Sequence, residues 1–121
     1  MYTLGVGLSS SARTADLHAA AVAVLAEAGL TWGEVAVVAT TTRLAGDERL
    51  AHLGPAVVGF DRSDLEAVRV PSRPGPAATR LAAPPVAEAA ALLAAGPGSR
   101  IVVPKRTGRY VTVAAAVGGG P

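Results

Sequence analysis

The first polar group that could bind a ligand is Gly5-Val-Gly7-Leu-Ser-Ser-Ser11, which follows an apolar segment and precedes a helical one. At such a junction, backbone N–H groups and the helix dipole favour a negative charge. Ser10 stands where a dinucleotide-binding loop has its third glycine, and the lysine of a phosphate-binding loop is missing. The segment is therefore either a structural turn capped by hydroxyl groups or an anion-facing loop built from Gly7, Ser9 and Ser10.

A second polar group, Thr40-Thr-Thr-Arg43, follows the next apolar segment along the chain. We expect it at the same sheet edge as the first group, where open α/β sheets bind their ligands. The hydroxyl groups of Thr41 and Thr42 and the guanidinium of Arg43 could hold carboxylates. Threonine is also common at strand ends, so a purely structural role stays open.

Two adjacent cations, Lys105 and Arg106, follow Pro104 at the end of an apolar strand. Neighbouring side chains on a strand point to opposite faces, so only one of the two cations is expected to face a site. The alternative is that both lie in a solvated hairpin turn.

Candidates for acid–base chemistry are few. Asp47-Glu48 could be an acid pair or a metal-binding pair, or it could begin a solvated helix. Glu88 lies in the expected first turn of an alanine-rich helix, where the helix dipole stabilises a negative charge. The alternatives for Glu88 are that it faces a ligand cleft or pairs with Lys105. Glu88 and Asp47 are the candidate catalytic bases, and no complete catalytic set emerges.

The composition excludes several classes of protein. The 121 residues suffice for one domain, half of them are apolar, and the absence of cysteine rules out disulfides and cysteine-based metal sites. His18 and His52 lack a third ligand at metal spacing, so we expect no metal and no cofactor. The cations are dispersed and aromatic residues are scarce, which argues against nucleic acid as a partner. The longest apolar run is too short to cross a bilayer and no leader pattern is visible, so we expect a cytoplasmic protein without membrane contact.

Apolar segments alternate with segments of helical periodicity, which is typical of an α/β protein. We expect one three-layer α/β/α sandwich over residues 1–117, with a flexible tail at 118–121. Its mixed sheet of about five strands should be mostly parallel, with an antiparallel last strand. The proline-rich segment 71–85 predicts a mobile loop. The strands are expected at 2–8, 35–40, 57–60, 101–103 and 110–117, and the helices around 17–28, 45–53, 61–68 and 85–95.

Several short motifs, in one fixed order, resemble the CobE/CbiG C-terminal domain family of cobalamin biosynthesis. This order extends over nearly the whole chain, from Leu4 to Ala116. Two departures stand out: Leu8-Ser-Ser-Ser11 replaces a Cys-Arg-Arg-Gly-like turn of the family, and Pro85 replaces a serine at the start of a helix. The matching motifs are Gly5-Val-Gly7, Ala28-Gly-Leu30, Asp47-Glu48, Val70-Pro71, Pro84-Pro-Val-Ala-Glu-Ala-Ala-Ala-Leu92, Val103-Pro-Lys-Arg106 and Thr112-Val-Ala114.

The resemblance implies a role in building the corrin ring. The hypothesis we favour is that the protein is an accessory or carrier protein, like CobE, and binds a precorrin or corrinoid intermediate. One alternative is an enzyme, a hydrolase or lyase that opens the lactone of cobalt-precorrin-5A, as CbiG-like proteins do with an additional N-terminal region. Another is a docking module for a different corrin biosynthetic enzyme. Corrin intermediates carry acetate and propionate carboxylates, and the cations implied around them are Arg43, Arg80, Lys105 and Arg106, with the 71–85 loop closing over the ring.

Overall fold

The computed structural model describes residues 1–68 and 86–119. The strands and helices expected from the sequence are all present, with some differences at their ends. The expected loop at 71–85, with Arg80 inside it, and residues 120–121 of the tail lie outside the described residues. In chain order the elements are β1 (Tyr2–Leu8), α1 (Thr14–Ala28), the 3-10 helix η1 (Trp32–Glu34), β2 (Val35–Thr41), α2 (Glu48–Ala51), β3 (Ala56–Phe60), α3 (Arg62–Glu66), α5 (Val86–Ala95), β4 (Arg100–Gly108) and β5 (Val111–Val117).

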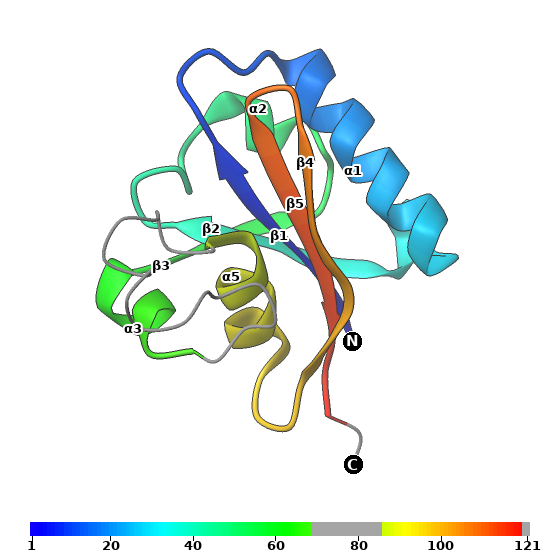
Figure 1. Ribbon diagram of the computed structural model, residues 1–121, viewed down its shortest axis with the longest axis vertical. Helices are drawn as coiled ribbons and strands as arrows, with labels where there is room; N and C mark the ends of the chain where they lie inside the picture. The colour runs from blue at the N-terminus through cyan, green and yellow to red at the C-terminus, as the bar shows by residue number, and fades with distance from the viewer. Residues whose placement is uncertain (69–85, 120–121) are drawn as a thin grey trace.

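The five strands belong to one mixed sheet in the order β3-β2-β1-β5-β4 (Figure 1). β1 pairs in parallel with β2, and β2 with β3, whereas β5 is antiparallel to both β1 and β4. Four strands therefore run in the same direction and β5 alone runs against them. This arrangement confirms the predicted α/β class, with a mostly parallel sheet and an antiparallel last strand.

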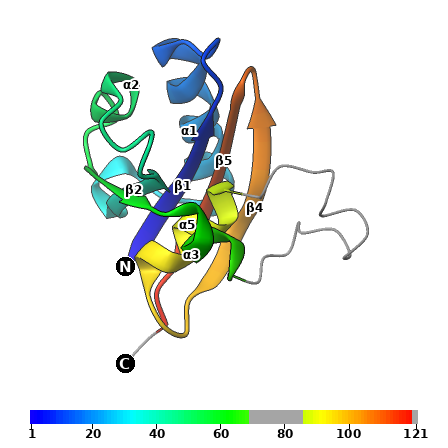
Figure 2. The same cartoon turned by 90° about the vertical axis from the view of Figure 1, so that its left-hand side faces the viewer.

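Helices cover both faces of the sheet and complete the three predicted layers (Figure 2). α1 packs on β4 and β5, and α2 contacts α1, whereas α5 packs against β1, β2 and β5, with α3 beside it. The side chains of β1 alternate between the two layers. Leu4, Val6 and Leu8 belong to the core beneath α1, and Thr3 and Gly5 face α5.

The alanine-rich sequence of α5 lets its backbone lie directly against β1. A Cβ atom on Gly5 would overlap the backbone oxygen of Ala87 and lie 2.9 Å from the backbone nitrogen of Ala91, so the packing requires glycine here. Two residues earlier, on the same face of β1, the hydroxyl of Thr3 donates to the backbone oxygen of Ala91 at 2.7 Å. Residues 87–91 are all buried, and all except Glu88 are alanine. Small side chains thus set the distance between helix and sheet.

β4 is longer than the sequence predicted. It continues to Gly108 because Arg106, Thr107 and Gly108 all pair with β5. A register shift between Val103 and Arg106 accommodates Pro104, which has no N–H to donate and is tolerated on an edge strand. Lys105 and Arg106 therefore lie inside the strand and not beyond its end.

A capping residue explains the end of α1 and the start of α2, but not the start of α3. Gly29, in the left-handed region at φ 71°, ends α1 as predicted. Asp47 caps α2 by accepting a hydrogen bond from the backbone N–H of Arg49, and this cap starts the helix at Glu48 instead of the predicted residue 45. Asp61 occupies the predicted N-cap position of α3, but its side chain makes no capping hydrogen bond.

Candidate functional site

A groove of about 400 Å³ lies beside the carboxyl end of β1, where the first turn of α5 meets the β4–β5 hairpin. Gly7 has no side chain, and a Cβ atom built on it would lie 4.0 Å from the nearest neighbouring atoms. This residue therefore leaves open space in the groove. The lining is mainly apolar and includes several hydroxyl-bearing residues and one lysine. The lining residues are Gly7, Leu8, Ser9, Val86, Ala87, Lys105, Thr107, Gly108, Tyr110, Val111 and Thr112.

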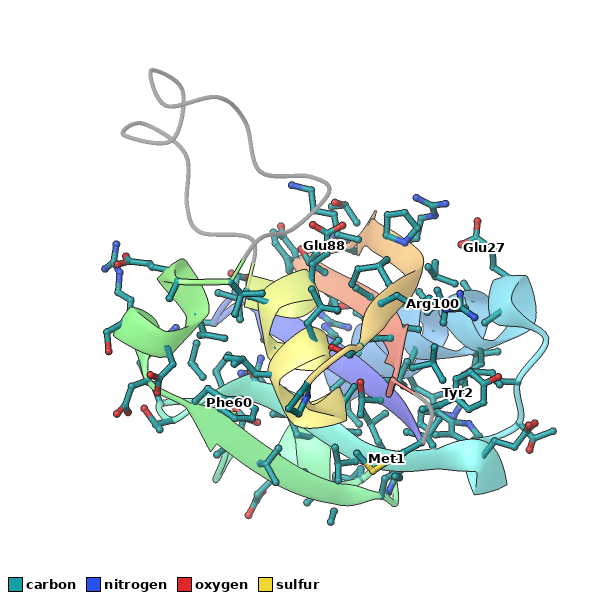
Figure 3. All side chains as sticks on the ribbon, turned by 90° about the horizontal axis from the view of Figure 1, so that it is seen from below. Met1, Tyr2, Glu27, Phe60, Glu88 and Arg100 are labelled. Atoms are coloured by element: carbon teal, nitrogen blue, oxygen red, sulfur yellow. The ribbon has the colours of Figure 1, made fainter. Side chains whose placement is uncertain are left out.

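Three of the predicted ligand residues, Gly7, Ser9 and Lys105, meet in this groove. A fourth, Glu88, lies directly behind Lys105 and is fully buried. Its Oε2 accepts a hydrogen bond from the backbone N–H of Lys105 at 3.0 Å. Figure 3 shows Glu88 between α5 and β4, and Glu27 on the other side of β4. Glu88 thus contacts Lys105 through the backbone amide of that residue.

Arg106 lies on the opposite face of the sheet from Lys105. Its Nη2 is 2.9 Å from Oε1 of Glu27 on α1, and its Nε donates to both carboxylate oxygens of that residue. The hydrogen bond from Arg106 lowers the pKa of Glu27. The expectation that only one of the two adjacent cations faces the groove therefore agrees with the structure, and Arg106 is placed away from the other candidates.

The hydroxyl- and arginine-containing turn after β2 lies at the same edge of the sheet but outside the groove lining. Thr40 is buried and donates to the backbone oxygen of Val6 at 2.7 Å, and Oγ1 of Thr41 accepts from the backbone N–H of Leu44 at 3.3 Å. Thr42 and Arg43 are exposed. Ser10 is likewise exposed and does not line the groove.

Asp47 belongs to a structural clamp. The guanidinium of Arg49 contacts both carboxylate oxygens of Asp47, at 2.9 Å from Nε and 2.6 Å from Nη2. These contacts lower the pKa of Asp47 from 3.8 to about 2, mainly through the side-chain hydrogen bond. Nη1 of Arg49 also donates to the backbone oxygens of Ser9 and Ala12. The pair thereby ties α2 to the turn that follows β1, and a carboxylate held in this way is a poor general base.

Within residues 1–68 and 86–119, no three His, Cys, Asp or Glu side chains gather in a way that could hold a metal ion. None of the helices described there is long and apolar enough to span a bilayer.

Three lining residues were not predicted from the sequence: Tyr110, Thr107 and Thr112. Thr107 and Thr112 face the groove because they pair with each other across the β4–β5 hairpin. Tyr110 lies in the two-residue turn between Gly108 and Val111, and its exposed ring reaches the groove from there. The only sequence signal for Tyr110 was an aromatic residue in an otherwise aromatic-poor chain.

The arrangement is suited to binding. The residues that the structure describes in the groove lining combine apolar side chains with one lysine and several hydroxyl groups, and none of them carries a carboxylate or an imidazole. Such a surface fits a ligand with an apolar body and peripheral carboxylates.

The comparison that identifies the chain is its match to the family described as cobalamin synthesis G C-terminus, which extends over residues 2–116. The chain belongs to this family. The predicted resemblance to the CobE/CbiG C-terminal domain is thereby confirmed, and the protein is a cobalamin biosynthesis protein of the CobE/CbiG type. No curated protein matches the chain in sequence.

Solved structures of this family share the fold. The cobalamin biosynthesis protein chiG from Agrobacterium tumefaciens is 30% identical, with a TM-score of 0.73 and alignment over 99% of this chain and 100% of that one. CobE, a protein from the cobalamin (vitamin B12) biosynthetic pathway, has a TM-score of 0.79 at 22% identity, over 96% of this chain and 92% of that one. A putative cobalamin biosynthesis protein G homolog from Sulfolobus solfataricus has a TM-score of 0.73 at 18% identity. The match covers 95% of this chain but only 36% of the Sulfolobus protein.

Proposed function

We propose that the protein binds a corrinoid or precorrin intermediate in the groove beside Lys105 and acts in the pathway as an accessory or carrier protein. The observation that carries the proposal is the presence of exposed Lys105 in the lining of a mainly apolar groove. A corrin macrocycle combines apolar faces with acetate and propionate groups around its edge. The floor formed by Gly7, Val86 and Ala87 suits the ring, and Lys105 suits a carboxylate.

The size of the groove limits what it can hold. Sites for whole small molecules span roughly 300–1,000 Å³, and this open groove has about 400 Å³. A macrocycle would therefore place one edge in the groove and leave the rest outside it. Binding of this kind suits a protein that holds an intermediate and passes it on.

A visible-absorbance titration with hydrogenobyrinic acid tests the proposal. We expect a saturable spectral shift for the wild-type protein. Lys105→Ala should weaken binding about tenfold, because a charge-assisted hydrogen bond contributes on the order of 1.5 kcal/mol or more. Arg106→Ala is the matched control: it removes the same charge from the neighbouring residue, which lies on the other face and is paired with Glu27.

Two outcomes would overturn the proposal. The first is the absence of any spectral shift for the wild-type protein, which would favour a docking module over a carrier. The second is an equal loss of affinity in both variants, which would mean that net charge attracts the ligand and that the groove does not hold it.

A further inference from the structure

A second hollow of about 330 Å³ lies at the tip of the β4–β5 hairpin and shares Tyr110 with the groove. Its lining is polar, in contrast to the groove, and it contains two guanidinium groups and one carboxylate. The residues that line it are Ser11, Arg13, Asp16, Arg109 and Tyr110. The two hollows are therefore neighbours, with the tyrosine between them.

The two guanidinium groups of this hollow are not neutralised by the protein. In the part of the chain that the structure describes, Arg49, Arg62 and Arg106 each form an ion pair, whereas Arg13 and Arg109 form none. The acidic residue in the lining of the hollow, Asp16, accepts a hydrogen bond from the backbone N–H of Arg13 at 3.0 Å. The side chains that line the hollow thus carry a net positive charge.

The conformation of Tyr110 is unusual for its side chain. It has a φ of 61°, in the left-handed region, where a turn ordinarily has glycine or asparagine. The residue is 51% exposed, and the guanidinium of Arg109 lies 5.8 Å from the centre of its ring. A large, half-exposed aromatic residue at a position that favours glycine points to a role outside folding.

We infer that the hollow lined by Arg13 and Arg109 is a second carboxylate-binding subsite for the ligand whose edge lies in the groove. The inference rests on the proposed function. In this arrangement a polycarboxylated macrocycle extends across the hairpin tip. One of its apolar faces contacts the Tyr110 ring, one carboxylate pairs with Lys105, and another pairs with Arg13 and Arg109. Paired guanidinium groups suit a carboxylate because they offer planar, bidentate hydrogen bonds.

Two measurements test the subsite. The first is the hydrogenobyrinic acid titration on the double variant Arg13→Gln/Arg109→Gln, for which we expect affinity to fall at least tenfold. Arg100→Gln is the matched control, since Arg100 is an exposed arginine at the opposite end of β4, and it should change affinity less than twofold. The second is an NMR titration of the wild-type protein with tricarballylate, a small tricarboxylate. It should shift the backbone amides of Ser11, Arg109 and Tyr110.

The two measurements separate the subsite from the proposed function. If hydrogenobyrinic acid binds and only Lys105→Ala weakens it, while tricarballylate shifts none of these amides, the subsite is overturned and the groove stands. If hydrogenobyrinic acid does not bind but tricarballylate shifts these amides and the double variant abolishes the shifts, the proposed function is overturned and the anion subsite is supported. The absence of both signals overturns both.

Discussion

The buried carboxylate of Glu88 accepts a hydrogen bond from the backbone N–H of Lys105 at 3.0 Å. The donor lies within the register shift of β4, where the strand does not follow regular pairing with β5. The first turn of α5 therefore holds this irregular part of the edge strand in place. The side chain of Lys105 reaches the groove from a backbone position that Glu88 sets, so Glu88 is a positioning residue for the proposed site.

Replacing Glu88 by alanine should lower the free energy of unfolding by about 2 kcal/mol, because it removes the buried acceptor of a backbone donor. Glu88→Gln keeps an acceptor oxygen and should cost less. Urea denaturation measures both changes. The control is Glu48→Ala, which removes an exposed carboxylate, also in the first turn of a helix. Equal losses for Glu88→Ala and Glu48→Ala would contradict this role of Glu88.

The stability of the protein should respond strongly to an added methyl group at one glycine of β1 and only weakly at another. Gly5→Ala would place a Cβ atom against the backbone of α5, so we expect a loss of about 3 kcal/mol or more. Gly7→Ala meets nothing closer than 4.0 Å and should change stability by less than about 1 kcal/mol. Its methyl group would enter the groove, so hydrogenobyrinic acid should bind more weakly to a protein that remains folded. Thermal unfolding together with the absorbance titration checks both expectations.

The Asp47–Arg49 pair should make stability depend on pH in the acid range. The pKa of Asp47 is about 2 in the folded protein against an ordinary value of 3.8. A lowered folded pKa contributes stability that is present above pH 4 and is lost as the pH falls toward 2. The two side chains are 22% and 20% exposed, so we expect a contribution of about 1 to 2 kcal/mol.

Asp47→Asn removes this contribution. The variant should be less stable than the wild-type protein at pH 7 and nearly equal to it at pH 2, as measured by urea unfolding across that range. A stability difference that stays constant with pH would show that the amide replacement acts through packing and not through the charge.

The backbone at Tyr110 should store strain that glycine relieves. Tyr110→Gly and Tyr110→Ala both remove the ring, and they differ only in the Cβ atom at a φ of 61°. We expect the glycine variant to be more stable than the alanine variant by about 1 kcal/mol, because only the alanine variant keeps the steric cost of the left-handed conformation. If the two variants unfold at the same denaturant concentration, the turn is not strained.

Several features of the fold were predictable because they depend on neighbours along the chain. The limits of β1 and the end of α1 at Gly29 follow from local patterns, namely an apolar segment and a residue able to adopt a positive φ. The separation of Lys105 from Arg106 also follows, since adjacent side chains on a strand face opposite ways. The family resemblance was visible for the same reason, because its motifs are short and keep their order.

The order of the elements, the family and the residue types available for binding thus follow from the sequence alone. The packing of the elements then selects which of these residues meet. Glu88 and Lys105 are 17 positions apart, and Tyr110 reaches Ser9 and Gly7 only because β5 pairs with β1. Arg49 was not a candidate, yet it holds the turn at Ser9 from 40 positions away. Such contacts depend on how helices and strands pack across the sheet. The spacing of two residues along the chain does not give the distance between them in the folded protein.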